Sequence, residues 1–464
     1  MANATDLNAR FLTGSTMRHV AVMASTGAIG LVAVFAVDLL NLLYISMLGH
    51  QPVAAAVGFA GTVGFFQVSL AIGLTIGVSA AVSTRIGAGK VQEARRLATA
   101  GLVLIILATS LVALATVLAL DPILGLLGAA GETRSLAASF LALTAVSVPF
   151  LAAGMCFAAL LRSVGDARRS MNVTLAAAFA TAVLDPLLIF GLGLDLTGAA
   201  ISTVLSRIFL AFVGWHGVTR RHAMLGRFEL AGFAADTRAM LAVSGPAVLS
   251  NLATPVAAAY VTGSMALFGP AAVAGQATID RITPVAFGLV YALTGAVGPI
   301  VAQNAGAGRF DRVRSAVRDS MVFTLLAVLG AWALLWLVQD LLVIAFSARD
   351  ATADILRLFC TWTAGSFVFV GALYVSNAVF NNLGRPLLST AFNWSRATLG
   401  TIPLVMLGIA HGPAGVMLGQ AVGSIVFGAA ATWVAFGIAG RLEARARKPG
   451  RTGMQDAVGT SGLS

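Results

Sequence analysis

Charged side chains are scarce in this 464-residue sequence, at 10% of residues against roughly a quarter in a typical soluble domain. Hydrophobic residues make up 58% and the mean hydropathy is +0.92, which together exclude a soluble globular protein. Cysteine occurs only at Cys156 and Cys360, both within apolar stretches, so no disulfide framework is expected. The five histidines show no ligand spacing, so we predict no metal centre and no cofactor.

Apolar residues are grouped into twelve stretches, each long enough for a transmembrane helix of about 20 residues. We place these helices at 18–48, 52–84, 98–120, 132–162, 170–194, 197–221, 239–268, 270–304, 315–340, 350–382, 387–410 and 412–440. The first stretch is too long for a signal-peptide core, so it is expected to be retained. The sequence predicts an all-α membrane protein with a polar N-terminus at 1–17 and a disordered tail at 441–464.

Lysine and arginine are concentrated on one side of this map. Of the 29 basic residues, 23 lie on the side of the N-terminus and the even-numbered loops. The remainder are Arg134, Arg349 and Arg357 on the other side, and Arg207, Arg281 and Arg396 within helices. Because basic loops stay in the cytoplasm, both termini are predicted to be cytoplasmic. Topology accounts for the net charge of +11, so no nucleic-acid partner is expected.

Two loop motifs recur at one offset. The segment 85–90 (RIGAGK) resembles 304–309 (NAGAGR), and Gly165 corresponds to Gly384; both pairs are 219 residues apart. This offset predicts a duplicated six-helix unit at 18–221 and 239–440, joined by a cytoplasmic linker at 222–238. Six helices give both halves the same orientation, so we predict a two-fold axis along the membrane normal and a cavity between the lobes.

Three acids lie well inside predicted helices: Asp38, Asp185 and Asp280. An ionisable side chain at such depth usually faces a bundle interior or a water-filled cavity. Asp185 precedes Pro186, which lacks an N–H and so frees the carbonyl of Ala182.

Helix rise places further polar residues near Asp185. Thr181 lies one turn earlier, and Thr203 lies at about the same depth on the next helix, at about 1.5 Å per residue. Asp38 lies near this level on the first helix, followed by Asn41. We predict a pocket for a proton or a small cation formed by Asp38, Asn41, Thr181, Asp185 and Thr203. The simpler alternative is a kinked helix whose acid is bound to a neighbouring polar group.

The second half lacks this acid pair, since adding 219 to Asp38 and Asp185 gives Ala257 and Leu404. An architectural role would persist in both copies, so the asymmetry favours chemistry in the first half. Candidates for a substrate cavity or polar site in the second half are Asp280, Arg281, Tyr260 and Asn377. Adjacent residues on a helix do not face each other, so Asp280 and Arg281 are expected to meet different neighbours. Core packing of the tyrosine and helix–helix bonding by the asparagine are the alternatives.

The chain resembles the multidrug and toxic compound extrusion (MATE) family over about residues 18–440, and is most similar to its DinF-like bacterial branch. The resemblance rests on the segments 37–40 (VDLL), 184–191 (LDPLLIFG), 299–309 (PIVAQNAGAGR) and 381–386 (NNLGRP). It implies two six-helix lobes and coupling through Asp38 and Asp185, with Thr203 as the hydroxyl of helix 6. Thr181 stands where the family often has asparagine, and the frequent helix 1 proline is absent. A threonine supplies only one hydroxyl, which favours H⁺ over Na⁺.

We therefore predict a monomeric antiporter of the bacterial inner membrane. It is expected to export small organic compounds, cationic or amphipathic, across the bilayer in exchange for H⁺ or Na⁺. A lipid-linked precursor flippase of the same superfamily is the alternative, and would line its cavity with cations such as Arg207, Arg281 and Arg396. A membrane-embedded enzyme is the other alternative, but no His/Glu metal pair, Ser/Lys dyad or Cys/His pair supports it.

Overall fold

The computed structural model describes residues 7–48 and 50–447, and within these ranges the chain is helical, without a β-strand. Each of the twelve predicted stretches is a helix or a run of consecutive helices. The first half contains α1 (Thr16–Met47), α2 (Gln51–Gly87), α3 (Val91–Leu118), α4 (Leu120–Leu126), α5 (Gly131–Ala145), α6 (Val148–Ser163), α7 (Ala167–Pro186) and α8 (Asp195–His216). The second half contains α9 (Leu230–Ala266), α10 (Pro270–Ala286), α11 (Gly288–Gly306), α12 (Phe310–Ala345), α13 (Asp350–Thr361), α14 (Phe367–Asn382), α15 (Pro386–Ser395), α16 (Ile402–Ile409) and α17 (Gly412–Ala446).

Some of the predicted spans are broken helices. In the described ranges, nine helices are long and apolar enough to cross a membrane individually. Two more spans are bent pairs, with α5 and α6 meeting at 48° and α10 and α11 at 50°. The remaining span is interrupted, because a π-helical segment, η5 (Arg396–Thr401), joins α15 to α16. The predicted twelve-helix architecture is therefore confirmed.

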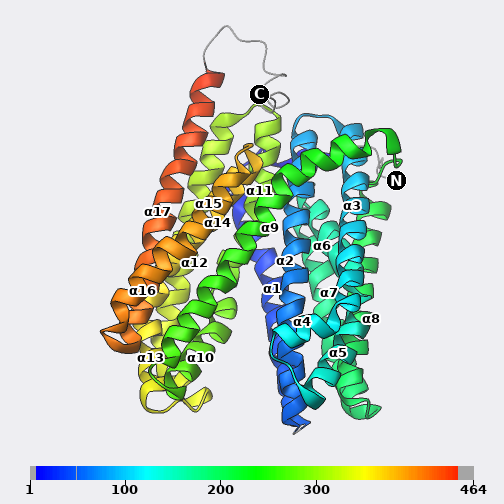
Figure 1. The fold of residues 1–464 in the computed structure, drawn as a ribbon. Coiled ribbons are helices and arrows are strands. Elements are labelled where there is room, and N and C mark those ends of the chain that lie inside the picture. The colour runs from blue at the N-terminus through cyan, green and yellow to red at the C-terminus, as the bar shows by residue number, and fades with distance from the viewer. Residues whose placement is uncertain (1–6, 49, 448–464) are drawn as a thin grey trace.

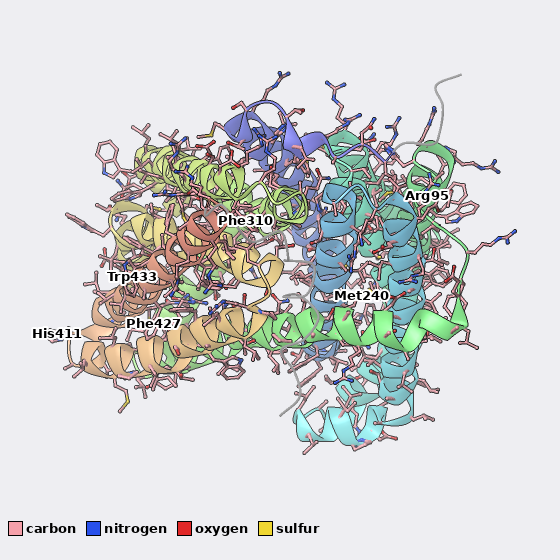
Figure 2. The ribbon with its side chains drawn as sticks, turned by 90° about the horizontal axis from the view of Figure 1, so that it is seen from above. Arg95, Met240, Phe310, His411, Phe427 and Trp433 are labelled. Carbon is pink, nitrogen blue, oxygen red and sulfur yellow. The ribbon has the colours of Figure 1, made fainter. Side chains whose placement is uncertain are left out.

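The helices form two lobes that lie side by side (Figure 1). α1 to α8 build the N-lobe and α10 to α17 build the C-lobe, while α9 reaches from one lobe to the other (Figures 1 and 2). Met240, near the start of α9, is fully buried against Gly101 of α3. Further along, the carbonyl of Pro246 accepts a hydrogen bond from Thr390 of α15 at 2.8 Å. Helix α9 is thus packed against both lobes.

The 219-residue repeat is visible in the helix boundaries. α2 corresponds to α10 and α11 together, and α6 corresponds to α14, with no difference in register at either end. Left-handed backbone positions match as well. Gly89 and Gly308 have φ of 72° and 70°, and Gly165 and Gly384 have φ of 75° and 74°. Both halves carry the same fold in the same direction, which confirms the predicted duplication about an axis along the membrane normal.

The lobes meet at the predicted cytoplasmic end and diverge toward the other end (Figure 1). Helices α2 and α11 cross there at two glycines that the repeat relates. A Cβ on Gly87 would lie 2.0 Å from the carbonyl oxygen of Gln303, and one on Gly306 would lie 2.1 Å from that of Thr84. Only glycine permits such close backbone approach.

The N-terminal segment packs into this junction. Phe11, in the short helix η1 (Arg10–Leu12), is 1% exposed. Its N–H donates to the Gln303 side chain at 3.1 Å, and its carbonyl accepts from Arg312 at 2.9 Å. Gln303 also donates to the carbonyl of Ser163 in the N-lobe at 2.6 Å. One side chain of α11 therefore links the N-terminal segment to both lobes.

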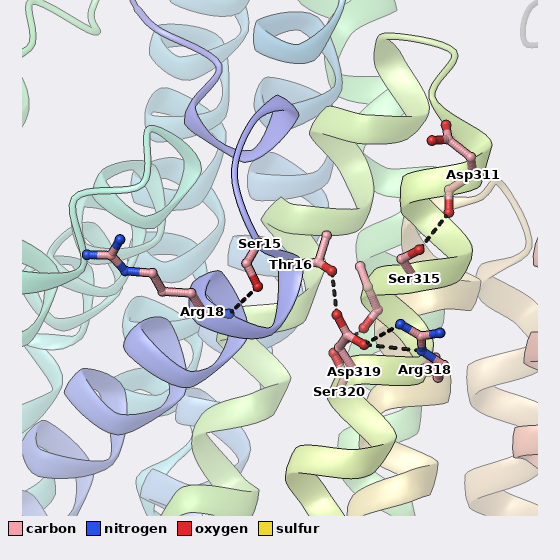
Figure 3. Close-up of polar contacts among 9 residues, drawn as sticks. Ser15, Thr16, Arg18, Asp311, Ser315, Arg318, Asp319 and Ser320 are labelled. Carbon is pink, nitrogen blue, oxygen red and sulfur yellow. Dashed lines mark hydrogen bonds and ion pairs between the residues drawn. The ribbon is translucent and has the colours of Figure 1, made fainter.

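The start of α1 is bound to α12 in the same region. The hydroxyl of Thr16 donates a hydrogen bond to Asp319, whose other oxygen contacts Arg318 at 3.2 Å (Figure 3). Asp319 is buried, so its carboxylate requires these partners. The contact ties the start of α1 to α12.

Two predicted boundaries differ from the structure. Residues 222–238 were expected to form a linker, but α9 already begins at Leu230, because Asp236 is held on α3 by Arg96 at 3.1 Å. The predicted disordered tail begins as helix through Ala446, where Glu443 pairs with Arg314 at 3.2 Å. The rest of that tail, residues 448–464, lies outside the described residues.

Candidate functional site

Asp185 is buried in the N-lobe, at 1% exposure. Helix α7 ends at Pro186 and continues as a π-helical segment, η2 (Leu187–Gly191). The proline removes one N–H from the helical ladder, and Leu192 donates to the carbonyl of Leu187, five residues earlier, at 2.9 Å. Such π-helical irregularities often occur at functional positions. The aspartate is thus positioned by a stretch of backbone that departs from α-helical geometry.

Asn41 of α1 provides a hydrogen bond to this acid. Its side-chain amide donates to Asp185 Oδ2 at 2.7 Å, whereas Oδ1 is buried without a hydrogen-bond partner in the described part of the chain. A buried carboxylate oxygen without a donor is costly. Oδ1 is therefore available to bind a proton or a cation.

Asp38 lies one turn before Asn41 on α1, within electrostatic range of Asp185. Its side chain is exposed, in contrast to that of Asp185. Two carboxylates this close repel each other when both are ionised. Of the five predicted pocket residues, the structure brings together Asp38, Asn41 and Asp185.

The two threonines bond to their own helices. Thr181 donates to the carbonyl of Ala177 at 3.1 Å, and Thr203 donates to that of Ala199 at 2.9 Å. Each hydroxyl retains acceptor capacity. Neither donates to the carboxylate of Asp185.

Ser202, which was not predicted from the sequence, faces α7 more directly than the predicted Thr203. Gly198 of α8 lies against the carbonyl of Leu188, and Ser202 is one turn further along that face. Antiparallel packing brings Ser202 to about the level of Asp185. Its hydroxyl is fully buried and has no hydrogen-bond partner among the described residues. The sequence signal for Ser202 was its position four residues after Gly198, on the side of α8 where a glycine permits close packing.

Arg207, one turn beyond Thr203, reaches the bend between α5 and α6. Its guanidinium donates to the hydroxyl of Ser147 at 3.0 Å and approaches the carbonyl of Thr144 at 3.4 Å. A helix break leaves carbonyls without helical partners, and a guanidinium can satisfy them. This arginine therefore supports the bend.

The C-lobe contains a separate cavity of about 170 Å³. Asp280 and Gln276 of α10, Tyr291 of α11, Tyr374 of α14 and Arg396 line it. The Gln276 amide donates to Asp280 Oδ1 at 2.9 Å. The cavity thus combines an acid, a base and four aromatic side chains, since Phe359 and Phe367 line it too.

The other candidates in the second half lie elsewhere. Arg281 is exposed, and Tyr260 packs against the apolar core of the C-lobe. Asn377 accepts a hydrogen bond from Asn393 at 3.0 Å and so joins α14 to α15. Of the four second-half candidates, only Asp280 lines the cavity.

The sites of the two lobes are chemically different at equivalent positions. Asp38 corresponds to Ala257, which lines the C-lobe cavity, and Asp185 corresponds to Leu404. Conversely, Asp280 and Arg396 correspond to Gly61 and Ala177 of the N-lobe. Each lobe therefore carries a polar site that is absent from the equivalent positions of the other lobe.

Comparisons with known proteins agree with this architecture. The family model MatE matches residues 28–187 and 246–407. A FAD transporter of Shewanella oneidensis is 30% identical over 421 residues, covering 89% of this chain and 93% of that protein. The multidrug export protein MepA of Staphylococcus aureus is 29% identical over 175 residues, or 37% of this chain and 38% of MepA. A mutant form of the Vibrio cholerae MATE transporter VcmN matches in structure with a TM-score of 0.88 and 26% identity, covering 92% of this chain and 97% of VcmN.

Proposed function

Because the chain belongs to the MATE family of membrane transporters, we propose that it exports organic compounds in exchange for H⁺ or Na⁺, with Asp38 and Asp185 as the coupling acids. The observation that carries this proposal is the buried Oδ1 of Asp185, which has no donor among the described residues. A carboxylate at this depth needs neutralisation or a partner. A bound proton or cation meets that need.

Coupling follows if the two conformations of the transporter hold this ion with different affinity. A ligand shifts an equilibrium only by its differential affinity for the two states. Asp38 is exposed while Asp185 is buried, so the pair connects the accessible side of α1 to the interior of the N-lobe. Ion exchange at Asp38 can thus change the state of Asp185.

The geometry supports H⁺ more than Na⁺. A metal cation needs several oxygen ligands that converge on one point, whereas a proton needs one oxygen. Asn41 presents its amide nitrogen, not its oxygen, to the acid. The hydroxyls of Thr181 and Thr203 bond to their own helices, and neither is hydrogen-bonded to Asp185. Asp185 is accordingly assigned as the proton carrier, and Na⁺ is the alternative ion.

The first candidate substrate is an amphipathic or cationic organic compound, and the similarity to a multidrug export protein, MepA, supports the export of drugs. The similarity to a FAD transporter supports a second candidate, an aromatic compound that bears phosphate. Arg396 in the C-lobe cavity specifically favours this second candidate. A flippase for lipid-linked precursors has less support, because Arg207 is engaged at the α5–α6 bend and Arg281 does not line the cavity. The protein is assigned to the bacterial inner membrane as a monomer, with both termini cytoplasmic.

Efflux from energised inverted vesicles tests the coupling assignment. Asp185→Asn and Asp38→Asn should abolish uphill transport of a fluorescent cation or of FAD, and Thr203→Ala should only weaken it. Asp311→Asn, the same change at an exposed acid outside the pocket, is the matched control. Wild-type transport by both pocket variants, at equal expression, would refute the assignment. Dependence on a Na⁺ gradient alone, at fixed pH, would identify Na⁺ as the coupling ion.

A further inference from the structure

We infer that the C-lobe cavity binds an anionic group of the transported compound, with Arg396 as its anchor. This inference rests on the proposed export function and specifies the substrate class. The substrate it describes is an aromatic compound with a phosphate or carboxylate and with hydrogen-bond donors elsewhere.

Arg396 is a buried cation without a carboxylate partner in the described part of the chain. The residue is 7% exposed and lines the cavity, and its Nε has no hydrogen-bond partner among the described residues. The described part of the chain offers it no carboxylate within 4.0 Å. A buried guanidinium without a partner is strongly unfavourable, and its planar donors match phosphate or carboxylate. An anion entering the cavity would satisfy it.

Thr363 supplies a second unpaired group on the cavity wall. Its residue exposure is 8%, and its hydroxyl has no hydrogen-bond partner in the described ranges. A hydroxyl can donate to an anionic oxygen. Two buried polar groups from different segments of the C-lobe therefore lack partners around one cavity.

Asp280 sets a second requirement on the ligand. It lines the same cavity but is exposed, so it lies where the cavity is accessible. Gln276 satisfies one of its oxygens at 2.9 Å, and the other can accept from a hydroxyl or amino group. A ligand with its anion at Arg396 and a donor at Asp280 would match both charges. A purely cationic compound would leave the arginine unpaired.

The remaining wall and the size of the cavity indicate an aromatic end. The rings of Tyr291 and Tyr374 lie 5.8 Å apart at 44° and both line the cavity. Phe359 and Phe367 line the cavity as well, so four aromatic side chains form its wall and can pack against an aromatic group of the ligand. The volume of about 170 Å³ is below the roughly 300 Å³ of the smallest drug-sized pockets. The cavity therefore holds one end of a larger compound.

These features are particular to the C-lobe. At the equivalent N-lobe positions, 219 residues earlier, Arg396 is replaced by Ala177, Tyr291 by Ile72 and Tyr374 by Met155. The C-lobe in turn has Ala257 and Leu404 where the N-lobe has its acid pair. The N-lobe site is thus suited to a proton or a cation, and the C-lobe cavity to an anion.

Two flavins test the inference, because riboflavin and riboflavin 5′-phosphate share one ring system and differ by a phosphate. Their binding to the purified full-length protein can be followed by flavin fluorescence without any ion gradient, so the result is independent of coupling. The wild type should bind the phosphate more tightly by about tenfold to a hundredfold, as a charge-assisted contact predicts. Arg396→Gln should remove this preference while leaving riboflavin binding similar, and Arg396→Lys should restore part of it.

Arg207→Gln is the matched control, since it alters an intramembrane arginine that already has protein acceptors. It should keep the phosphate preference. Each variant is checked for a single peak in size-exclusion chromatography and for thermal unfolding. An unchanged preference in folded Arg396→Gln would overturn the inference. So would a wild type that binds both flavins equally or binds neither, even if efflux in vesicles shows the proposed coupling.

Discussion

Replacing Gly87 with alanine should separate the two lobes at their predicted cytoplasmic end. The added Cβ would lie 2.0 Å from the carbonyl oxygen of Gln303, whereas carbon–oxygen contacts in proteins are about 3.3–3.6 Å. The neighbouring atom is backbone, so α2 and α11 must move apart by about 1 Å or more. Overpacking of this kind costs about 1–3 kcal/mol. The population of the observed contact should then fall by about fivefold to a hundredfold relative to the separated state.

Thiol labelling can measure this shift. Ser163 is fully buried, and its carbonyl accepts from Gln303 across the junction. The native cysteines are buried, so Ser163→Cys provides a reporter whose maleimide reaction tracks separation of the lobes. Gly87→Ala in this background should react faster by the factor given above. Gly330→Ala, where a Cβ meets open space, is the control. Equal labelling rates in the two variants would refute the argument that the glycine crossing holds the lobes together.

Three further predictions concern stability, measured as thermal unfolding of purified protein. Phe11→Ala should lower the free energy of unfolding by about 3–5 kcal/mol, because the ring is 1% exposed. Phe66→Ala, at an exposed phenylalanine, is the control, and an equally small effect of both substitutions would contradict the role of Phe11 in the junction. Arg207→Met should lower the free energy of unfolding by about 1–3 kcal/mol, because it leaves the acceptors at the α5–α6 bend without their donor. An unchanged melting temperature would show that Arg207 does not stabilise the bend. Burial alone would raise the pKa of Asp166, but hydrogen bonds from His222 and Arg169 outweigh it and hold the pKa well below its usual range. Because the pKa is lowered in the folded state, the ionised carboxylate stabilises the fold above about pH 4, and this contribution is lost as pH falls further. The difference in melting temperature between the wild type and Asp166→Asn should therefore become smaller on acidification. A constant difference would contradict that linkage.

The sequence predicted the depth of a residue in the bundle wherever helical geometry alone decides it. Counting residues from the helix ends placed Asp38, Asn41 and Asp185 at one level, because helical rise per residue is nearly constant. The same counting placed Thr203 at this level but did not give the direction of its side chain. That direction depends on which face of α8 packs against α7, and the contact at Gly198 shows that Ser202 lies on this face.

Positions that depend on distant packing could not be predicted. Arg396 was only one of three arginines within helices. Its place in a cavity follows from how η5, which packs against α9 and α17, lies across the cavity from residues of α10, α11 and α14, and no local pattern specifies this arrangement. Pro149, the second residue of α6, was a sequence signal for the α5–α6 bend. The interaction of Arg207 with this bend could not be predicted without the bend itself.

The coupling role of Asp185 can be tested most directly by measuring proton release when substrate binds to the purified protein in weakly buffered solution. If the acid pair carries the coupling proton, substrate binding to the wild type should release protons, and Asp185→Asn should bind substrate with little or no release. The control Asp311→Asn should behave as the wild type. Undiminished proton release from Asp185→Asn would contradict the assignment of this carboxylate as the coupling site.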